Sequence, residues 1–273
     1  MLSYQHIYHA GNLADVHKHA MLAWMLAYLT AKDKPLTYLE THAGRGLYQL
    51  DAPEAVKTGE AAQGIARVAD WFAPDHPYAK RLAQVRALHG PMAYPGSPLL
   101  AALSLRPADR MFLADLHPQE VAALAYAMSP YPATVYQRDG AEMALALCPP
   151  DPKRGLLLID PSYEIKDDYL ALPGLIRRLH RKWGVGVIVL WYPVLPDPKL
   201  GPPHRPMLRL LAEMFAETDP DKLCRHEVHF PPARPGHRMT GSGLFVVNPP
   251  YGFAAEAARL TARYATLCPQ PQG

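Results

Sequence analysis

The clearest hydrophobic pattern in this chain is a run of four aliphatic residues, 156–159, that ends at Asp160-Pro161. Consecutive aliphatic residues without polar alternation predict a strand buried on both faces, which is typical of the centre of a parallel sheet. Proline cannot donate to the ladder and keeps its preceding residue extended, so we expect the chain to turn there. The turn places Asp160 and Tyr163 beyond the carboxyl end of the strand, where open α/β sheets bind ligands.

Strand-like and helix-like segments alternate along most of the chain. Further strands are predicted at 37–40, 110–116, from 134, and at 185–191, 223–230 and 243–248. Helices are predicted at 20–31, 61–72, 78–89, 97–105, from 141, and at 169–183 and 205–218. Three prolines and two glycines in 231–242 exclude a crossover helix, so the last two strands should be antiparallel. The pattern predicts an α/β fold of seven strands with the last one reversed.

The connection between the first two strands is unusually long. About seventy residues separate Glu40 from Asp115, whereas a βαβ crossover needs only a dozen to thirty. We therefore predict a helical insertion after the first strand. Residues 1–49 would form an N-terminal arm and the start of the main domain, 50–95 the inserted subdomain, and 96–273 the remainder.

Composition narrows the class of protein. Hydrophobic residues make up 49% of the chain and charged residues 19%, without a run of eighteen apolar residues, which predicts a soluble globular protein. The N-terminus has neither a basic nor an apolar signal region, and the three cysteines, Cys148, Cys224 and Cys268, are distant and odd in number. These features predict reduced thiols in the cytoplasm. The net charge of +3 permits nucleic acid binding without requiring it.

The N-terminal segment is rich in histidine, with four between positions 6 and 19. A metal site is one interpretation, but His17 and His19 would lie on different faces of a helix, and neither cysteine nor paired acids join them. We predict no metal. A polar arm that closes over a ligand is the favoured interpretation, because neutral imidazoles can hydrogen-bond a carboxylate or a ribose.

Other strands also end in residues suited to a cofactor. Asp115 ends its strand and could receive the two hydroxyls of an adenosine ribose. Asp139-Gly140 follows the next strand, where the acid could meet an adenine edge or simply cap a helix. The turn at 44–46 could let a cofactor approach the backbone, or be a plain turn, and it is not a G-x-G-x-x-G fingerprint. Ser97 is predicted to be a helix N-cap.

The residues 160–163 suit the chemistry of an amino group on a nucleobase. Asp160 and the Pro161 carbonyl can each accept one N–H, while Tyr163 stacks on the base. Asp160-Pro161-Ser162-Tyr163 resembles the Asp/Asn-Pro-Pro-Tyr/Phe signature of S-adenosylmethionine-dependent amino-group methyltransferases. Ser162 replaces the second proline, which makes the loop less rigid. From the tetrapeptide alone, an ordinary strand and proline turn remains the alternative.

A wider set of motifs points to one family. The motifs are His9-Ala10-Gly11-Asn12-x-Ala14-Asp15-x-x-Lys18-His19, Thr41-His42-Ala43-Gly44, Tyr94-Pro95-Gly96-Ser97-Pro98, Leu116-His117-Pro118 and Met239-Thr240-x-Ser242-Gly243. Across nearly the whole chain they resemble the ribosomal RNA large-subunit methyltransferase J family. The resemblance implies a class I, Rossmann-like S-adenosylmethionine-dependent methyltransferase fold and methylation of N6 of an adenine in 23S ribosomal RNA.

The resemblance also implies roles for individual residues. The implied cofactor-binding residues are His19, His42, Ser97, Asp115, Asp139, Gly140 and Asp160. The implied catalytic residues are Asp160, Pro161 and Tyr163, and the implied substrate-binding residues are Tyr4, Lys18 and Tyr163. Asp115 stands where the family has a glutamate, so we expect a small shift of the ribose contact. Lys18 and Arg238 could contact phosphates or be exposed, solvated charges.

The expected partner is large-subunit ribosomal RNA, protein-free or in early assembly, with no membrane, and we expect a cytoplasmic monomer. A DNA adenine-N6 methyltransferase is the nearest alternative, and a non-catalytic RNA-binding protein that retains the fold is another. A nucleotide-binding oxidoreductase would share the acids after the strands, but it should carry a glycine fingerprint that 43–46 does not provide.

Overall fold

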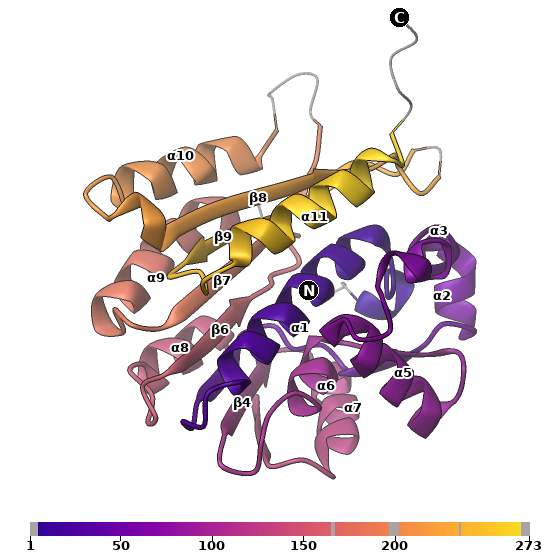
Figure 1. The fold of residues 1–273 in the computed structure, drawn as a ribbon, viewed down its shortest axis with the longest axis horizontal. Helices are drawn as coiled ribbons and strands as arrows, with labels where there is room; N and C mark the ends of the chain where they lie inside the picture. The colour runs from indigo at the N-terminus through magenta and orange to yellow at the C-terminus, as the bar shows by residue number, and fades with distance from the viewer. Residues whose placement is uncertain (1–4, 165–166, 197–201, 235, 269–273) are drawn as a thin grey trace, which may run out of the picture.

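The computed structural model describes residues 5–164, 167–196, 202–234 and 236–268, and its centre is a seven-stranded sheet (Figure 1). Across the sheet the strands are β5 (Ala133–Gln137), β4 (Arg110–Asp115), β1 (Thr37–Glu40), β6 (Gly155–Ile159), β7 (Val187–Val194), β9 (Gly241–Val247) and β8 (Leu223–His229). The first five run parallel, and β9 runs antiparallel to both neighbours. The predicted sheet with its reversed last strand is confirmed.

The central strand β6 is buried along its whole length. Its side chains alternate between two apolar cores: Leu156 and Leu158 join one, and Leu157 and Ile159 join the other. This is the two-sided burial that a continuous aliphatic run predicts. The sheet therefore separates two helical layers.

Helices cover both faces of the sheet. One layer holds α1 (Leu13–Thr30), α6 (Ser97–Ala102), α7 (Pro118–Met128) and α11 (Phe253–Ala265), and the other holds α8 (Gly140–Leu147), α9 (Asp168–Lys182) and α10 (His204–Met214). In Figure 1, α1 and α11 lie side by side, and they are in contact. The sequence prediction did not include α11. Both layers shield the apolar strands from water, as burial of apolar area requires.

The chain between β1 and β4 forms several short elements. They are β2 (Leu47–Gln49), α2 (Pro53–Thr58), α3 (Glu60–Gln63), α4 (Ile65–Val68), a 3-10 turn (Ala69–Trp71), α5 (Pro77–His89) and β3 (Ala93–Pro95), followed by α6. β2 and β3 form an antiparallel pair. The predicted single helix at 61–72 is wrong. The helical structure is interrupted at Gly64. A Cβ atom there would lie 2.1 Å from the Gly11 carbonyl oxygen, so the Gly64 backbone is in close contact with the N-terminal segment.

The N-terminal segment is more helical than predicted. After a 3-10 turn (His6–Tyr8), α1 begins at Leu13 rather than at residue 20. Asn12 is its N-cap, and its side chain accepts a hydrogen bond from the Asp15 backbone N–H at 2.8 Å. The expected loose polar arm is therefore wrong for residues 13–19, which are rigid parts of a buried helix.

Strand β7 is longer than predicted. It continues past Trp191 through Pro193 to Val194 and pairs with β9 as far as Gly241. On its other side, pairing with β6 stops at Leu190. A proline is tolerated there because the ladder beyond Leu190 has a partner on one side only. The extension gives Trp191 a fixed place at the edge where the parallel strands end.

Candidate active site at the carboxyl edge of the sheet

The carboxyl ends of the parallel strands gather acidic residues at one edge. Glu40 is the last residue of β1, and Asp115 is the last residue of β4. Asp160 directly follows β6, and one residue separates Asp139 from the end of β5. The register pairs Glu40 with Leu113 on one side and with Leu158 on the other. The sheet therefore brings together acids that are far apart in the sequence, at the edge where α/β folds bind ligands.

Asp160 is held by Lys18 from helix α1. The Lys18 Nζ donates to Asp160 Oδ2 at 2.6 Å and lies 3.1 Å from Asp15 Oδ1. The three side chains are 5%, 12% and 2% exposed, respectively. Burial lowers the pKa of Lys18, but Asp160 and Asp15 outweigh it, so the pKa is raised and the ammonium stays charged. The prediction that Lys18 could be an exposed, solvated charge is wrong, because helix α1 carries the side chain inside.

Asp15 is the second anchor of this network. One of its oxygens accepts from the Gly11 backbone N–H at 2.9 Å and lies 2.8 Å from His6 Nε2. Burial raises the pKa of Asp15, but the opposing effect of His6, Lys18 and His19 is larger, so the pKa of this carboxyl lies well below its usual value. The ionised Asp15 thus fixes Lys18, which in turn fixes Asp160.

His19 and Ser97, both predicted to bind the cofactor, lie beneath this layer. His19 is fully buried, and its Nδ1 lies 3.0 Å from the Tyr94 hydroxyl. Burial lowers the pKa of His19 to about 3, so its imidazole is neutral. Ser97 is not the N-cap of α6, because Gly96 takes that place and the Ser97 hydroxyl donates to Glu40 Oε1 at 2.5 Å.

Glu40 is a buried acid that the sequence prediction did not include among the site residues. It accepts hydrogen bonds from Ser97 and, at 2.8 Å, from the Tyr38 hydroxyl. Burial raises the pKa of Glu40 to about 8, although these two donors oppose the shift. Its position at the end of a buried strand was the available signal, since polar residues at strand ends of α/β sheets face the ligand edge.

Three predicted cofactor residues lie half-buried at the edge. Asp115 accepts from the Gly44 backbone N–H at 2.9 Å and from the His117 backbone N–H at 2.8 Å. His42 follows β1, and its Nδ1 lies 2.7 Å from the Thr41 hydroxyl. Asp139 caps α8, accepting from the Glu142 backbone N–H at 2.9 Å. The capping interpretation of Asp139 is thus confirmed, and its adenine contact stays a prediction.

The glycines of the first and third loops allow close backbone approach. A Cβ at Gly140 would lie 2.0 Å from the Thr41 carbonyl oxygen, so the start of α8 packs directly on the loop after β1. Gly44 has a φ of 62°, a left-handed conformation that favours glycine. The start of α8 therefore lies against the loop after β1, and the Gly44 N–H connects that loop to Asp115.

Tyr163 is buried against Trp191 and Tyr169 rather than exposed to solvent. Its hydroxyl donates to the Trp191 carbonyl at 2.7 Å, and its ring lies 4.5 Å from the Tyr169 ring, centroid to centroid. The residue is 9% exposed and has a φ of 55°, a strained conformation for a tyrosine. Stacking on a base therefore stays a prediction. Tyr4, the other predicted aromatic contact, lies outside the described residues.

The edge also contains Trp191, which the sequence analysis did not select. The Lys18 Nζ lies 5.5 Å from the centroid of its ring, a cation–π distance. Pro161 is buried and Ser162 is exposed in the loop between β6 and α9. Arg238 lies exposed in the connection between β8 and β9.

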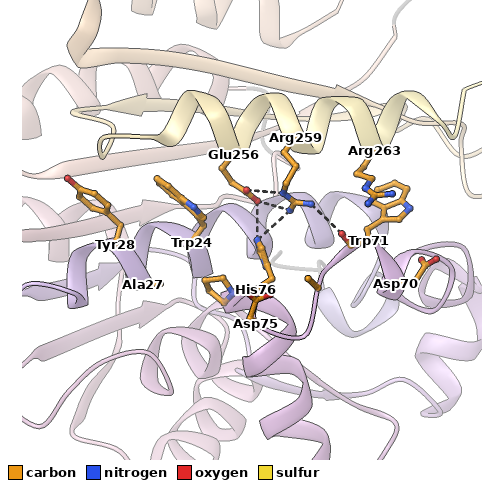
Figure 2. A pocket seen from close by; sticks show the side chains of 12 residues that line it. Trp24, Ala27, Tyr28, Asp70, Trp71, Asp75, His76, Glu256, Arg259 and Arg263 are labelled. Atoms are coloured by element: carbon orange, nitrogen blue, oxygen red, sulfur yellow. Dashed lines mark hydrogen bonds and ion pairs between the residues drawn. The ribbon is translucent and has the colours of Figure 1, made fainter.

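A separate groove of about 650 Å³ lies between α1, α11 and the start of α5. Figure 2 shows Trp24 and Tyr28 projecting from α1, while Glu256 and Arg259 reach toward His76. The Arg259 guanidinium is already bound by Glu256, at 2.7 and 2.9 Å. Two exposed acids, Asp70 and Asp75, also line the groove and would oppose a phosphate backbone. The strand-end site is the better candidate for chemistry.

The part of the chain that the structure describes has neither a metal-binding cluster nor a membrane-spanning helix. It contains no group of three or more His, Cys, Asp or Glu side chains arranged to hold a metal ion. None of its helices is both long enough and apolar enough to cross a membrane.

Comparison of folds defines the class of protein. A crystal structure of a S-adenosylmethionine-dependent methyltransferase from Agrobacterium tumefaciens superposes with a TM-score of 0.50 at 12% identity, covering 88% of this chain and 64% of that one. At that identity the likeness concerns the fold alone. Together with the order of the strands and the reversed β9, it places the chain in the class I, Rossmann-like methyltransferase fold.

Sequence comparison defines the family. Residues 33–273 match the family model described as "Ribosomal RNA large subunit methyltransferase D, RlmJ", and the chain belongs to this family. The chain is 38% identical to ribosomal RNA large subunit methyltransferase J of Escherichia coli K12, covering 92% of this chain and 88% of that protein. The protein of the same name from Haemophilus influenzae is 35% identical over 100% of this chain and 96% of its own length.

A solved structure supports the same relationship. The crystal structure of protein LPL1258 from Legionella pneumophila superposes with a TM-score of 0.80 at 36% identity. The match covers 95% of this chain and 94% of that one. The predicted family is confirmed by the family model and by the two named relatives.

Proposed function

We propose that this protein transfers a methyl group from S-adenosylmethionine to N6 of an adenine in large-subunit ribosomal RNA. The observation that carries the proposal is the network in which Asp15 and Lys18 of α1 hold Asp160, the acid directly after β6. Asp160 is followed by Pro161, in the loop where amino-group methyltransferases bind the target base. Family membership supports the RNA substrate, because both curated relatives are named as ribosomal RNA methyltransferases.

The strand-end residues suit an adenosyl cofactor. Two backbone amides hold the half-buried Asp115 carboxylate, which keeps further lone pairs for the two ribose hydroxyls. Gly44 and Gly140 let the neighbouring backbone come close. We infer that His42 and Asp139 complete the contacts at the edge, whereas the buried His19 and Ser97 support the site from below.

The proposed mechanism relies on positioning. When bound, the cofactor supplies an electrophilic methyl group on a sulfonium. Lys18 occupies Asp160 Oδ2, so the other oxygen can accept one N–H of the adenine amino group while the Pro161 carbonyl accepts the second. Both contacts aim the nitrogen lone pair at the methyl carbon.

The transfer is a direct displacement. With the cofactor bound, the amino nitrogen held by Asp160 and the Pro161 carbonyl would attack the methyl carbon, the N–C bond would form as the C–S bond broke, and the bonding electron pair would stay on sulfur. The methylated nitrogen then loses a proton, for which the Asp160 carboxylate is the nearest proposed acceptor. Tyr163 and Tyr4 are proposed to contact the base, and Tyr163 must expose more of its ring to do so.

The test is labelled methyl transfer to deproteinised large-subunit ribosomal RNA that lacks the modification, with nucleoside analysis. N6-methyladenosine should form, and Asp160→Ala should lower kcat by at least about a hundredfold because it removes the side-chain acceptor of the amino group. Calorimetry should show that Asp160→Ala changes cofactor affinity only a few-fold.

Asp167→Ala, at an exposed position, is the matched control and should keep full activity. Full activity in Asp160→Ala, or labelling of matched DNA instead of RNA, would overturn the assignment. Labelling of assembly intermediates alone would narrow the substrate to an immature particle. A single species in analytical ultracentrifugation would test the proposed monomer.

A further inference from the structure

A chain of side-chain hydrogen bonds runs from the candidate site through buried Ser242, His17 and His226 to Thr261 on the exposed side of α11. Trp191 Nε1 lies 2.9 Å from the Ser242 hydroxyl oxygen, which lies 2.8 Å from His17 Nδ1. His17 Nε2 lies 3.0 Å from His226 Nδ1, and His226 Nε2 lies 2.9 Å from the Thr261 hydroxyl. The chain thus joins β7, β9, α1, β8 and α11.

Its hydrogens can be placed from the two ends. The Trp191 indole can only donate, so Ser242 accepts from it and must donate its own proton to His17 Nδ1. At the other end, the Thr261 hydroxyl donates to the Ala257 carbonyl at 3.1 Å and therefore accepts from His226. In this arrangement both histidines are neutral, and His17 donates to His226.

The electrostatics agree with neutral imidazoles. Burial lowers the pKa of His226 to about 4, and burial, helped by His226, holds the pKa of His17 well below its usual value. His17 and Ser242 are both fully buried. A buried polar chain with every partner satisfied specifies one arrangement of its side chains.

The Trp191 end of the chain meets the catalytic groups. Its ring faces the Lys18 ammonium at 5.5 Å, and its carbonyl accepts the Tyr163 hydroxyl. Lys18 in turn holds Asp160. Pairing with Leu244 of β9 fixes the backbone of Trp191, and the hydrogen bond to Ser242 fixes the orientation of its indole.

We propose that Ser242 and His17 are positioning residues that hold the Trp191 indole under the Lys18 ammonium and so keep Asp160 in place for the amino group. This inference rests on the proposed function. A role in stability alone would affect folding without changing the reaction of the folded enzyme.

The test is a double-mutant cycle on methyl transfer with Ser242→Ala and Trp191→Phe. Each removes one end of the same hydrogen bond, and phenylalanine keeps a ring beneath Lys18. Each should lower kcat roughly tenfold with the KM for S-adenosylmethionine unchanged within about twofold, and the double variant should be no slower than the slower single one. His17→Gln should behave like Ser242→Ala.

Thr261→Val is the matched control, because it cuts the same chain at the end remote from Trp191. It should keep kcat within about twofold, even though it removes the hydrogen-bond partner of His226. Unchanged kcat in folded Ser242→Ala, additive effects in the double variant, or an equal loss in Thr261→Val would each overturn the proposal.

A second readout does not depend on activity. The Trp191 indole N–H resonance, assigned by its loss in Trp191→Phe, should shift in Ser242→Ala and His17→Gln but stay in place in Thr261→Val. An unmoved resonance in Ser242→Ala would show that the bond does not hold the ring and would overturn the positioning role. Wild-type protein that labels no RNA would instead overturn the proposed function.

Discussion

At the scale of single residues, the site depends on one buried ammonium between the buried carboxylate of Asp15 and the partly buried carboxylate of Asp160. The pKa of Lys18 is raised because the negative charges of Asp160 and Asp15 outweigh the lowering that burial causes. A buried charge that loses its partner is costly, since water can no longer solvate it. The three side chains therefore act as a unit, and replacing one of them affects both position and stability.

Lys18→Met should reduce methyl transfer strongly and destabilise the protein by about 3–5 kcal/mol, because it leaves the buried Asp15 and the partly buried Asp160 carboxylates without their cation. Urea unfolding followed by circular dichroism measures the loss of stability. Lys80→Met, on the exposed side of α5, is the control and should stay within about 0.5 kcal/mol of wild type. A Lys18→Met variant as stable as wild type would contradict the role of Lys18 in this network.

At the scale of elements, helix α1 decides where the N-terminal polar residues lie. Asn12 caps the helix through the Asp15 N–H and donates to Glu60 Oε2 at 3.0 Å. The helix then carries Asp15 and Lys18 to the sheet edge and places His17 in the core behind it. One cap thus connects the N-terminal segment, the insertion and the catalytic network.

Asn12→Ala should lower the free energy of unfolding by about 1–2 kcal/mol, because the helix loses its cap and Glu60 loses a donor. Asn12→Ser keeps a capping oxygen and should recover part of the loss. Equilibrium unfolding of both variants separates the cap from the contact to Glu60. Equal destabilisation by alanine and serine would assign the whole effect to Glu60 instead.

At the scale of the whole molecule, buried titratable groups shape the dependence of stability on pH. Burial depresses the pKa values of His19 to about 3 and His226 to about 4, so their contribution is present above pH 6.5 and is lost as the pH falls. Glu40 has the opposite sign. Its pKa of about 8 in the folded state means that its contribution is present below pH 4.5 and is lost as the pH rises toward 8.

Between pH 6.5 and 8 the contribution of these histidines to stability is constant, so the slope of stability against pH reports Glu40. We expect wild-type stability to fall across this window by about 1 kcal/mol per pH unit, because the unfolded carboxyl is ionised while the folded one keeps its proton. Glu40→Gln mimics the protonated acid and should flatten the slope. Chemical unfolding at half-unit intervals would test this, and parallel slopes in both proteins would contradict it.

The sequence by itself determined the sheet and the position of its most important acid. A continuous aliphatic run predicts a strand buried on both faces, and the proline that follows Asp160 cannot donate to the ladder, so Asp160 could be placed beyond β6 without a structure. The proline- and glycine-rich 231–242 segment likewise predicted the reversed β9. These inferences rest on local backbone chemistry, which sequence patterns report directly.

Only the tertiary structure decided which side chains meet there. Lys18 reaches Asp160 across 142 positions, and His17 reaches Ser242 across 225, contacts that no local pattern encodes. Ser97 suits an N-cap in sequence, yet its hydroxyl bonds to Glu40 because the fold brings that acid within reach. Local sequence favours where a strand stops, whereas the packing of α1 against the sheet and the place of β9 within it determine the partners of the buried polar groups.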